Sequence, residues 1–272
     1  MRKDSRFKRF ADTMKIRKFT GKVTTMNIYD FTSYEQVMVC GDIHGHFEVI
    51  YGNIHAENTL FIVAGDCGFG FNRPHFYEQL YASKMGRNLN KKNNAVIFIR
   101  GNHDDPVYFD GLSFNKKRAV CIPDYSIVRT AHHNILCIGG AISIDRTHRK
   151  QDKNAGFLYW PGEAPVFNPK MIKEISASKL KIDTVISHSG PSFCPPHTKD
   201  GIQSWLSQDP ALDSDLENER KTMDAVWHEL KKLGHPVRQW WYGHFHRSAW
   251  QKQDNCYFRL LDINEMDTLK NE

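Results

Sequence analysis

The sequence predicts an α/β domain, and two observations support that prediction. Short apolar, β-branched runs recur along the chain, and most of them are followed by polar or glycine-rich turns. Between these runs lie stretches in which apolar residues recur with helical spacing. Strands that alternate with helices in this way are typical of α/β folds.

Each apolar run has the composition of a buried strand. In chain order, strands are predicted at Val37–Cys40, Leu60–Ala64, Ala95–Ile99, Ile135–Ile138, Thr184–Ser187 and Trp240–Tyr242. Helices are predicted at roughly Phe47–Asn53, Pro74–Asn90, Pro169–Lys179 and Asp215–Leu233. The C-terminal tail differs, because Ala249–Gln251 and Cys256–Leu261 indicate a hairpin around the turn sequence KQDN.

The chain of 272 residues shows no linker that would divide it. We therefore expect one domain over 23–265, preceded by a basic extension at 1–22. Two segments, at about 144–169 and 190–214, are long and rich in Pro, Gly and aromatic residues. Loops of this length in a compact domain are usually functional or disordered, so we interpret both as inserts on the substrate side.

Composition indicates a globular protein, with 40% hydrophobic and 25% charged residues. No stretch approaches the roughly 20 apolar residues of a membrane span, and no signal-peptide apolar region follows the basic N-terminus. The six cysteines form no C-x-x-C pair, which argues against a zinc ribbon or a disulfide framework. We expect a soluble, cytoplasmic protein without a membrane partner.

The formal net charge is +6, and much of the excess lies in the first 22 residues, where nine Lys and Arg face only Asp4 and Asp12. A basic tail of this kind can attract nucleic acid or another anionic partner. A solvated, partly disordered extension explains the same composition. Nucleic acid and nucleotides therefore stay among the candidate partners.

The turns that follow five of the predicted strands carry an unusual set of polar residues. In open α/β sheets, loops at the carboxyl ends of strands converge on one crevice, so we expect these residues to meet. The turns are GDIHG (Asp42, His44), GDCG (Asp66), RGNHD (Arg100, Asn102, His103, Asp104), HSGP (His188) and GHFH (His244, His246).

The residue types in these turns are those of a metal site. Carboxylate, amide oxygen and neutral imidazole suit Mn²⁺, Fe or Zn²⁺, and thiolates are absent from the set. In a two-metal site the ions lie about 3.5–4 Å apart and clamp both the attacking and the leaving oxygen of a phosphoryl displacement. Glycines beside the ligands allow sharp turns and close approach of the backbone.

The five blocks resemble the calcineurin-like metallophosphoesterase superfamily, whose signature is D-x-H, G-D, G-N-H-[DE], a later His, and G-H-x-H. All blocks are present in order between Asp42 and His246, so the resemblance covers most of the chain. It implies a four-layer αββα sandwich in which two mixed β-sheets are flanked by helices. It also implies two divalent metal ions, with manganese favoured and iron, zinc or nickel as alternatives.

The resemblance further implies a role for each residue of the blocks. His103 would contact the phosphate and protonate the leaving oxygen as a general acid, and Asp104 would orient the His103 imidazole. Asp42, His44 and His246 would hold the first metal, Asp66 would bridge both, and Asn102, His188 and His244 would complete the second.

The function implied is hydrolysis of a phosphate mono- or diester by attack of a metal-bridging hydroxide. The Ser/Thr protein phosphatases of the superfamily read G-D-x-V-D-R-G at the second block, where this chain reads GDCGFGF and lacks the phosphate-binding Arg. Arg100 matches the Arg that precedes their G-N-H-E, which keeps that alternative open. A nuclease is a second alternative, favoured by the basic N-terminus and by an aromatic insert. A third alternative is a protein that keeps the fold but works as a non-catalytic scaffold. Such a protein would be expected to lack metal ligands or the His of G-N-H, and this sequence contains all of them.

Four further features have two interpretations each. In SIDRTHRK, Arg146 and Arg149 either bind substrate phosphate through their guanidinium forks or form a solvated basic loop. In FLYWPGE, the aromatic residues either pack the insert onto the body, or Tyr159 or Trp160 stacks on a nucleobase. Cys67 is either a packing residue, which we favour, or a redox-sensitive thiol. His46 is expected either to lie behind the metal ligands as a supporting residue or to face outward, because D-x-H already supplies two ligands.

Overall fold

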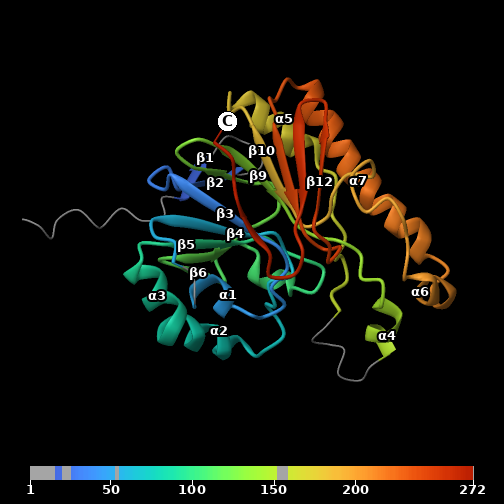
Figure 1. Ribbon diagram of the computed structural model, residues 1–272, viewed down its shortest axis with the longest axis horizontal. Coiled ribbons are helices and arrows are strands. Elements are labelled where there is room, and N and C mark those ends of the chain that lie inside the picture. Colours follow the sequence, from blue (N-terminus) through green and yellow to red (C-terminus); the bar gives the residue numbers. More distant parts are fainter. Residues whose placement is uncertain (1–15, 20–25, 53–54, 152–158, 272) are drawn as a thin grey trace, which may run out of the picture.

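The protein is described by a computed structural model that covers residues 16–19, 26–52, 55–151 and 159–271. Two β-sheets are stacked face to face, and helices cover the outer face of each (Figure 1). This arrangement confirms the predicted four-layer αββα sandwich.

The first sheet has six strands, and its four central strands are parallel. The edge strands β14 and β6 run antiparallel to their neighbours. The order is β14 (Met266–Thr268), β3 (Gln36–Cys40), β4 (Thr59–Val63), β5 (Ala95–Phe98), β7 (Ala119–Cys121) and β6 (Asn115–Lys116).

The second sheet has eight strands and contains the predicted C-terminal hairpin, β12–β13. Strands β9, β10, β11 and β13 are parallel neighbours. The order is β1 (Ile16–Phe19), β2 (Met26–Asp30), β8 (Ser126–Arg129), β9 (Asn134–Ile138), β10 (Thr184–Ser187), β11 (Gln239–Tyr242), β13 (Cys256–Leu260) and β12 (Ala249–Gln253).

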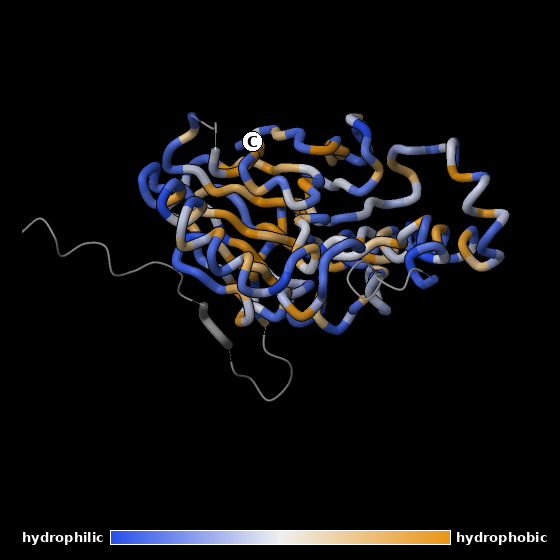
Figure 2. The backbone as a smooth tube through the Cα atoms, turned by 90° about the horizontal axis from the view of Figure 1, so that it is seen from below, coloured by the Kyte–Doolittle hydropathy of each residue, from blue (hydrophilic) through white to orange (hydrophobic). Residues whose placement is uncertain are grey.

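The predicted strands are apolar throughout because each one is buried on both faces. In β3, Val37 and Val39 point into the core between the sheets, whereas Cys40 points to the outer core under the helices. In β11, Trp241 faces the core between the sheets, and Trp240 faces the other outer core. Segments of hydrophobic residues accordingly lie in the middle of the molecule, and more hydrophilic segments lie outside them (Figure 2).

The helices divide between the two outer faces. Residues of α1 (Glu48–Tyr51), α2 (Pro74–Leu80), the π-helical turn η2 (Tyr81–Met85) and α3 (Gly86–Lys91) pack on the six-stranded sheet. Residues of α5 (Pro169–Ala177) and α7 (Leu212–Lys232) pack on the eight-stranded sheet. The sequence predicted one continuous helix over 74–90, and the structure interrupts it with η2.

The two predicted inserts contain short helices that the sequence did not indicate. The segment 144–169 holds α4 (Arg146–Gln151), and its residues 152–158 lie outside the described part. The segment 190–214 holds α6 (Gln203–Gln208) and the first turn of α7. A single 3₁₀ turn, η3 (Pro106–Tyr108), follows the third polar loop.

The sheets extend beyond the predicted domain bounds of 23 and 265, since β1 and β14 lie outside them. Most of the predicted basic extension, 1–15 and 20–22, lies outside the described residues. The sequence did not indicate β1, β2, β6, β7, β8 or β14, which are short or lie near a sheet edge. Among the described residues, no helix has the length and apolar character needed to cross a membrane.

Candidate metal centre

The five polar loops meet at one place, as predicted, because they follow parallel strands at the carboxyl ends of both sheets. Backbone hydrogen bonds tie them together. The His44 amide donates to the Asp66 carbonyl at 2.8 Å, and the His244 amide donates to Asp42 Oδ1 at 2.9 Å. The His103 amide donates to Asp66 Oδ1 at 2.9 Å, so loops of both sheets share these contacts.

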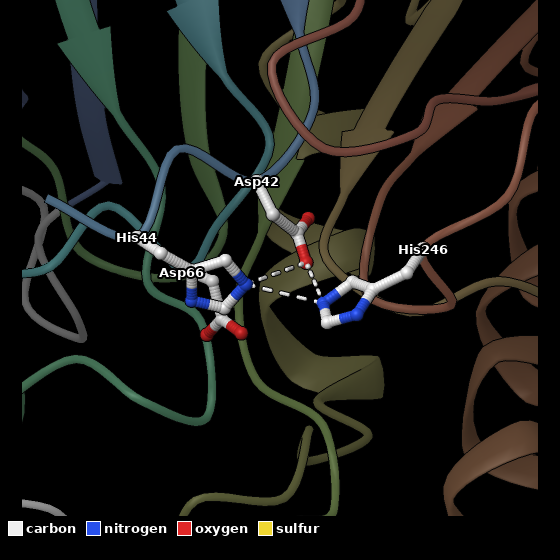
Figure 3. Close-up of side chains that lie close together, drawn as sticks. All are labelled: Asp42, His44, Asp66 and His246. Atoms are coloured by element: carbon white, nitrogen blue, oxygen red, sulfur yellow. Dashed lines mark hydrogen bonds and ion pairs between the residues drawn. The ribbon is translucent and has the colours of Figure 1, made fainter. Parts of the chain in front are cut away.

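One group of ligand atoms comes from Asp42, His44, Asp66 and His246, and these atoms all lie within 4.8 Å of one another. The Nε2 atoms of His44 and His246 are 3.1 Å apart, and both point toward Asp42 Oδ2, at 3.8 and 3.2 Å (Figure 3). These four side chains can hold a metal ion.

The chemistry of Asp42 fits a bound cation. Its side chain is 1% exposed, and within the described part of the chain its Oδ2 atom has no hydrogen-bond partner. A buried carboxylate oxygen without a partner is costly, and a metal ion would supply the missing interaction. Two imidazoles that point at this oxygen complete a donor set of the kind that transition metals take.

A second group of possible ligand atoms also lies close to Asp66. His188 Nε2 is 2.9 Å from Asn102 Oδ1 and 3.3 Å from Asp66 Oδ1. The Nδ1 atom of His188 is 2.8 Å from the Ala64 carbonyl, which can only accept, so Nδ1 carries the hydrogen. In the neutral ring Nε2 is then the nitrogen without a hydrogen, and it faces the two oxygens where a cation could bind.

His244 stands beside this second group. Its ring lies 5.1 Å from that of His188, centroid to centroid. Its Nε2 atom is 3.9 Å from Oε1 of the buried Glu219, which accepts hydrogen bonds from Ser189 Oγ and the Ile142 amide. Glu219 was not predicted from the sequence, although it is a charged residue on the inward stripe of α7, which is a recognisable signal.

Ser143 and Glu163, which were also not predicted from the sequence, fix the Asn102 side chain. Asn102 Nδ2 donates to Ser143 Oγ at 2.9 Å, and Ser143 Oγ donates to Glu163 Oε2 at 2.6 Å. Because the amide nitrogen is used in this way, Asn102 Oδ1 is left facing His188. Glu163 lies in an insert without periodicity, so no sequence signal pointed to it.

Backbone conformation at the centre is strained. His44, Asp66, His244 and His246 have φ of 42°, 47°, 72° and 47°, in the left-handed region that is uncommon for residues other than glycine. Such residues cluster at functional sites. Gly65, with φ of 100°, lies where a Cβ atom would collide with the His188 ring, which explains the glycine of that block.

The electrostatics of the centre call for positive charge. Burial disfavours ionisation of Asp66, but His103 and His188 beside it hold the pKa of Asp66 well below its usual range. Burial opposes protonation of His188, yet the carboxylates of Asp66 and Asp42 raise its pKa to about 9. Buried carboxylates that draw protons onto neighbouring imidazoles are a suitable environment for cations.

The expected contact between Asp104 and the His103 ring is not formed. Both Asp104 oxygens accept from backbone amides, those of Gly68 and Phe69 at Oδ1 and those of Cys67 and Gly101 at Oδ2. Within the described residues, His103 Nδ1 has no hydrogen-bond partner. The predicted orienting role of Asp104 is therefore corrected: the loop amides occupy its carboxylate, which shapes the second polar turn.

The three predicted substrate-binding arginines have different surroundings. Arg100 is buried and donates to Asp124 and to the Glu163 carbonyl, so its guanidinium braces the insert. Arg146 is buried between Asp209 and Asp215, at 2.6 and 2.7 Å, and joins α4 to the α6–α7 region. These hydrogen bonds and ion pairs argue against the phosphate-binding role predicted for both, and neither arginine is among the residues that line the cavity described next.

A cavity of about 660 Å³ opens beside the centre, and Asp66, Asn102, His103, His244 and His246 form part of its lining. Arg149 also lines it, and its Nε atom pairs with Asp145 at 2.7 Å. Of the three predicted arginines, Arg149 alone borders the cavity.

Three minor predictions can be placed. His46 is exposed and contacts Glu48, so of its two expected positions it takes the outward-facing one. Cys67 is fully buried, and burial raises the pKa of its thiol well above the usual range, which favours packing over redox chemistry. Trp160 packs beside Gly70 and donates to the His103 carbonyl at 3.4 Å, in agreement with the packing interpretation.

The fold and the paired ligand groups define a class of proteins, the α/β metal-dependent phosphoesterases. The sequence model of the calcineurin-like phosphoesterases matches residues 36–248, and the chain belongs to this family. Comparison with curated proteins gave no match.

Solved structures of similar architecture exist at low identity. A phosphopantetheinyl hydrolase from Mycobacterium tuberculosis is 16% identical, with a TM-score of 0.41 over 86% of this chain and 91% of that one. A structure named as a 5′-nucleotidase, from Staphylococcus aureus, is 11% identical, with a TM-score of 0.41 over 86% of this chain and 50% of that one. GAP50 of Plasmodium is 12% identical, with a TM-score of 0.42 over 84% and 72%. These likenesses carry no conclusion about substrate.

Proposed function

We propose that the protein is a dinuclear metal-dependent phosphoesterase that hydrolyses a phosphate mono- or diester. The observation that carries this proposal is the position of Asp66 between two groups of ligand atoms. It lies within 4.8 Å of the atoms offered by Asp42, His44 and His246, and its Oδ1 atom lies 3.3 Å from His188 Nε2. A carboxylate shared in this way suits a two-metal site.

In this proposal the metal-ligand residues keep the roles that their blocks imply. Asp42, His44 and His246 would hold one cation, Asn102, His188 and His244 would hold the other, and Asp66 would contribute to both. Oxygen and imidazole donors without thiolate favour manganese, with iron, zinc or nickel as alternatives. When bound, the cations supply Lewis acidity that neutralises charge on the phosphoryl oxygens and activates water for attack.

His103 is proposed to donate the proton that the leaving oxygen needs. Its side chain lines the cavity, and its Nε2 atom lies 3.8 Å from Asp66 Oδ2, which places it at the edge of the bridging position. Burial lowers the pKa of His103, the Asp66 carboxylate opposes that effect, and Arg149 adds to it. A bound phosphate anion would favour the protonated imidazole and prepare it as a general acid.

Arg149 is the arginine that we propose for phosphate binding. It lines the cavity together with His103 and is near enough to influence the His103 pKa. A guanidinium fork matches phosphate geometry. The Ser/Thr protein phosphatase alternative loses its main support, because Arg100 is occupied by Asp124 and Glu163.

The test is hydrolysis of p-nitrophenyl phosphate and bis(p-nitrophenyl) phosphate by protein loaded with Mn²⁺. Asp66→Asn and His103→Ala are each expected to lower kcat at least about a hundredfold, the scale of one general acid or more. The exposed residues Asp254 and His132 supply matched controls, Asp254→Asn and His132→Ala, which should retain full activity.

Metal analysis of the same samples completes the test. His103→Ala should keep its metal while losing activity, whereas Asp66→Asn should lose metal. Full activity in both variants with metal still bound would refute the assigned roles. Adding phosphopeptides, nucleotides and single-stranded DNA to the panel separates the phosphatase, nucleotidase and nuclease alternatives.

A further inference from the structure

The cavity beside the metal centre has a wall that hydrolysis alone does not require. Four partly buried apolar side chains line it, each from a different segment: Ile144 before α4, Ile202 before α6, Leu216 on α7 and Phe245 in the loop after β11. Hydrolysis of a phosphate ester at the metal ions does not require these apolar side chains. Apolar side chains that converge in a concave site normally contact an apolar part of a ligand.

Leu216 shows that this wall is not simply part of the core. It lies one turn after Leu212, on the stripe of α7 that also carries the buried Glu219 and Met223. Leu212 and Met223 are fully buried, whereas Leu216 lies where the cavity opens and stays partly exposed. The helix therefore presents an apolar side chain to the cavity at a position where a ligand can cover it.

Phe245 extends the wall to the metal centre and is held firmly in place. The Arg220 guanidinium lies over its ring, 4.8 Å from the centroid, and the His244 ring meets it edge-on at 4.7 Å. Arg220 is in turn anchored by the carbonyls of Pro191 and Cys194. Phe245 lines the same cavity as His244 and His246, so the ester group of a phosphate bound at the metal centre can reach this ring.

We propose that the wall formed by Ile144, Ile202, Leu216 and Phe245 is a leaving-group site, and that the substrate is a small phosphate ester whose leaving group has an apolar body. This inference rests on the proposed phosphoesterase function and specifies its substrate class. A cavity of about 660 Å³ is far larger than a phosphate group needs and falls in the range of small-molecule sites. Either an aliphatic chain or an aromatic ring would provide the apolar body of the leaving group.

The first experiment uses methyl, butyl and hexyl phosphate as substrates. Their leaving alcohols have nearly equal acidity, so intrinsic reactivity is constant and differences report binding of the chain. We expect kcat/KM to rise about fourfold per methylene group until the chain fills the cavity. A series in which kcat/KM does not change with chain length would overturn the inference and leave the proposed function intact.

Cavity-filling variants locate the effect. Leu216→Trp should lower kcat/KM for hexyl phosphate at least about tenfold more than kcat/KM for methyl phosphate, because only the longer chain needs the filled space. Ile202→Trp is a second variant with the same expected pattern, in case the first does not fold. Leu112, which is 65% exposed and lies outside the cavity lining, provides the control Leu112→Trp.

Binding provides a readout that does not depend on turnover. Hexylphosphonate, benzylphosphonate and cyclohexylmethylphosphonate have C–P bonds that hydrolysis does not cleave, so calorimetry can follow them on wild type and on Leu216→Trp. A more negative heat-capacity change than for methylphosphonate, reduced by the variant, supports the site. Tighter benzyl than cyclohexylmethyl binding would assign an aromatic leaving group, and the reverse order an aliphatic one.

The two proposals fail in different ways. If metal-loaded protein hydrolyses none of the esters but binds hexylphosphonate more tightly than methylphosphonate, the phosphoesterase function fails and the apolar site stands. If it hydrolyses methyl and hexyl phosphate equally well, and the phosphonates bind equally, the apolar leaving-group site fails.

Discussion

The Glu163 carboxyl group offers a test of how the centre is supported, because its burial has a calculable effect on stability. The residue is 3% exposed and accepts hydrogen bonds from the Ser143 amide at 3.0 Å and from Ser143 Oγ at 2.6 Å. Burial raises its pKa to about 7, although these hydrogen bonds oppose the shift. The perturbation is Glu163→Gln, which keeps the shape of the side chain and removes the titration.

The sign of the effect follows from the two pKa values. Below the unfolded-state pKa of 4.5, the Glu163 carboxyl group is protonated in both the folded and the unfolded state, so its titration does not change the free energy of unfolding. As pH rises toward 7, the unfolded chain releases the proton and the folded protein keeps it, so wild-type stability falls. The shift from 4.5 to about 7 corresponds to about 3 kcal/mol at 1.36 kcal/mol per unit of pKa.

The assay is urea denaturation of wild type and Glu163→Gln at intervals between pH 4.5 and pH 8.5, at fixed ionic strength and in the presence of a chelator. The unfolding free energy of the variant minus that of the wild type should rise by about 3 kcal/mol from the lowest to the highest pH. Most of this rise should occur below pH 7. A difference in unfolding free energy that stays constant across this range would refute the reasoning, since it would mean that Glu163 is ionised when folded.

Two further substitutions test contacts at the centre. Asp104→Asn should destabilise the protein by about 4 kcal/mol, because an amide group replaces one oxygen and leaves two buried backbone N–H groups without an acceptor. Denaturant midpoints measure this loss against the neighbouring Asp105→Asn, where Asn still caps η3. An unchanged midpoint with slowed hydrolysis would restore the orienting role first predicted for Asp104. Ser143→Ala frees the Asn102 amide and should weaken Mn²⁺ binding about 10–100-fold by calorimetry, whereas Ser207→Ala on α6 should not. Equal affinities would show that Asn102 needs no such support.

The sequence was informative wherever local chemistry and spacing decide the outcome. The strand-then-turn blocks predicted that Asp42, Asp66 and His188 would meet, because parallel strands deliver their carboxyl ends to one edge. Continuous apolar runs predicted strands buried on both faces, which the sandwich confirms. Edge strands such as β14 gave no such signal, since a short strand with one neighbour needs little apolar sequence.

Residues in the inserts could not be assigned in the same way. From the sequence, Arg100, Arg146 and Arg149 are equivalent candidates, because nothing in a loop sequence identifies the partner of an arginine. The partners are distant in sequence: Asp124 and the Glu163 carbonyl for Arg100, and Asp209 and Asp215 for Arg146. Pairing across such distances is a property of the folded chain.

The sequence by itself therefore determined the family, the four-layer architecture and the four residues whose ligand atoms can hold a metal ion, Asp42, His44, Asp66 and His246. Those features depend on residue type and on spacing along single strands and turns, which are local properties. Tertiary structure alone decided what surrounds that set: the amides that occupy Asp104, the Ser143–Glu163 support of Asn102, and the apolar wall that includes Leu216 and Phe245. Each of these joins segments that lie tens of residues apart, and only packing of the whole chain brings them into contact.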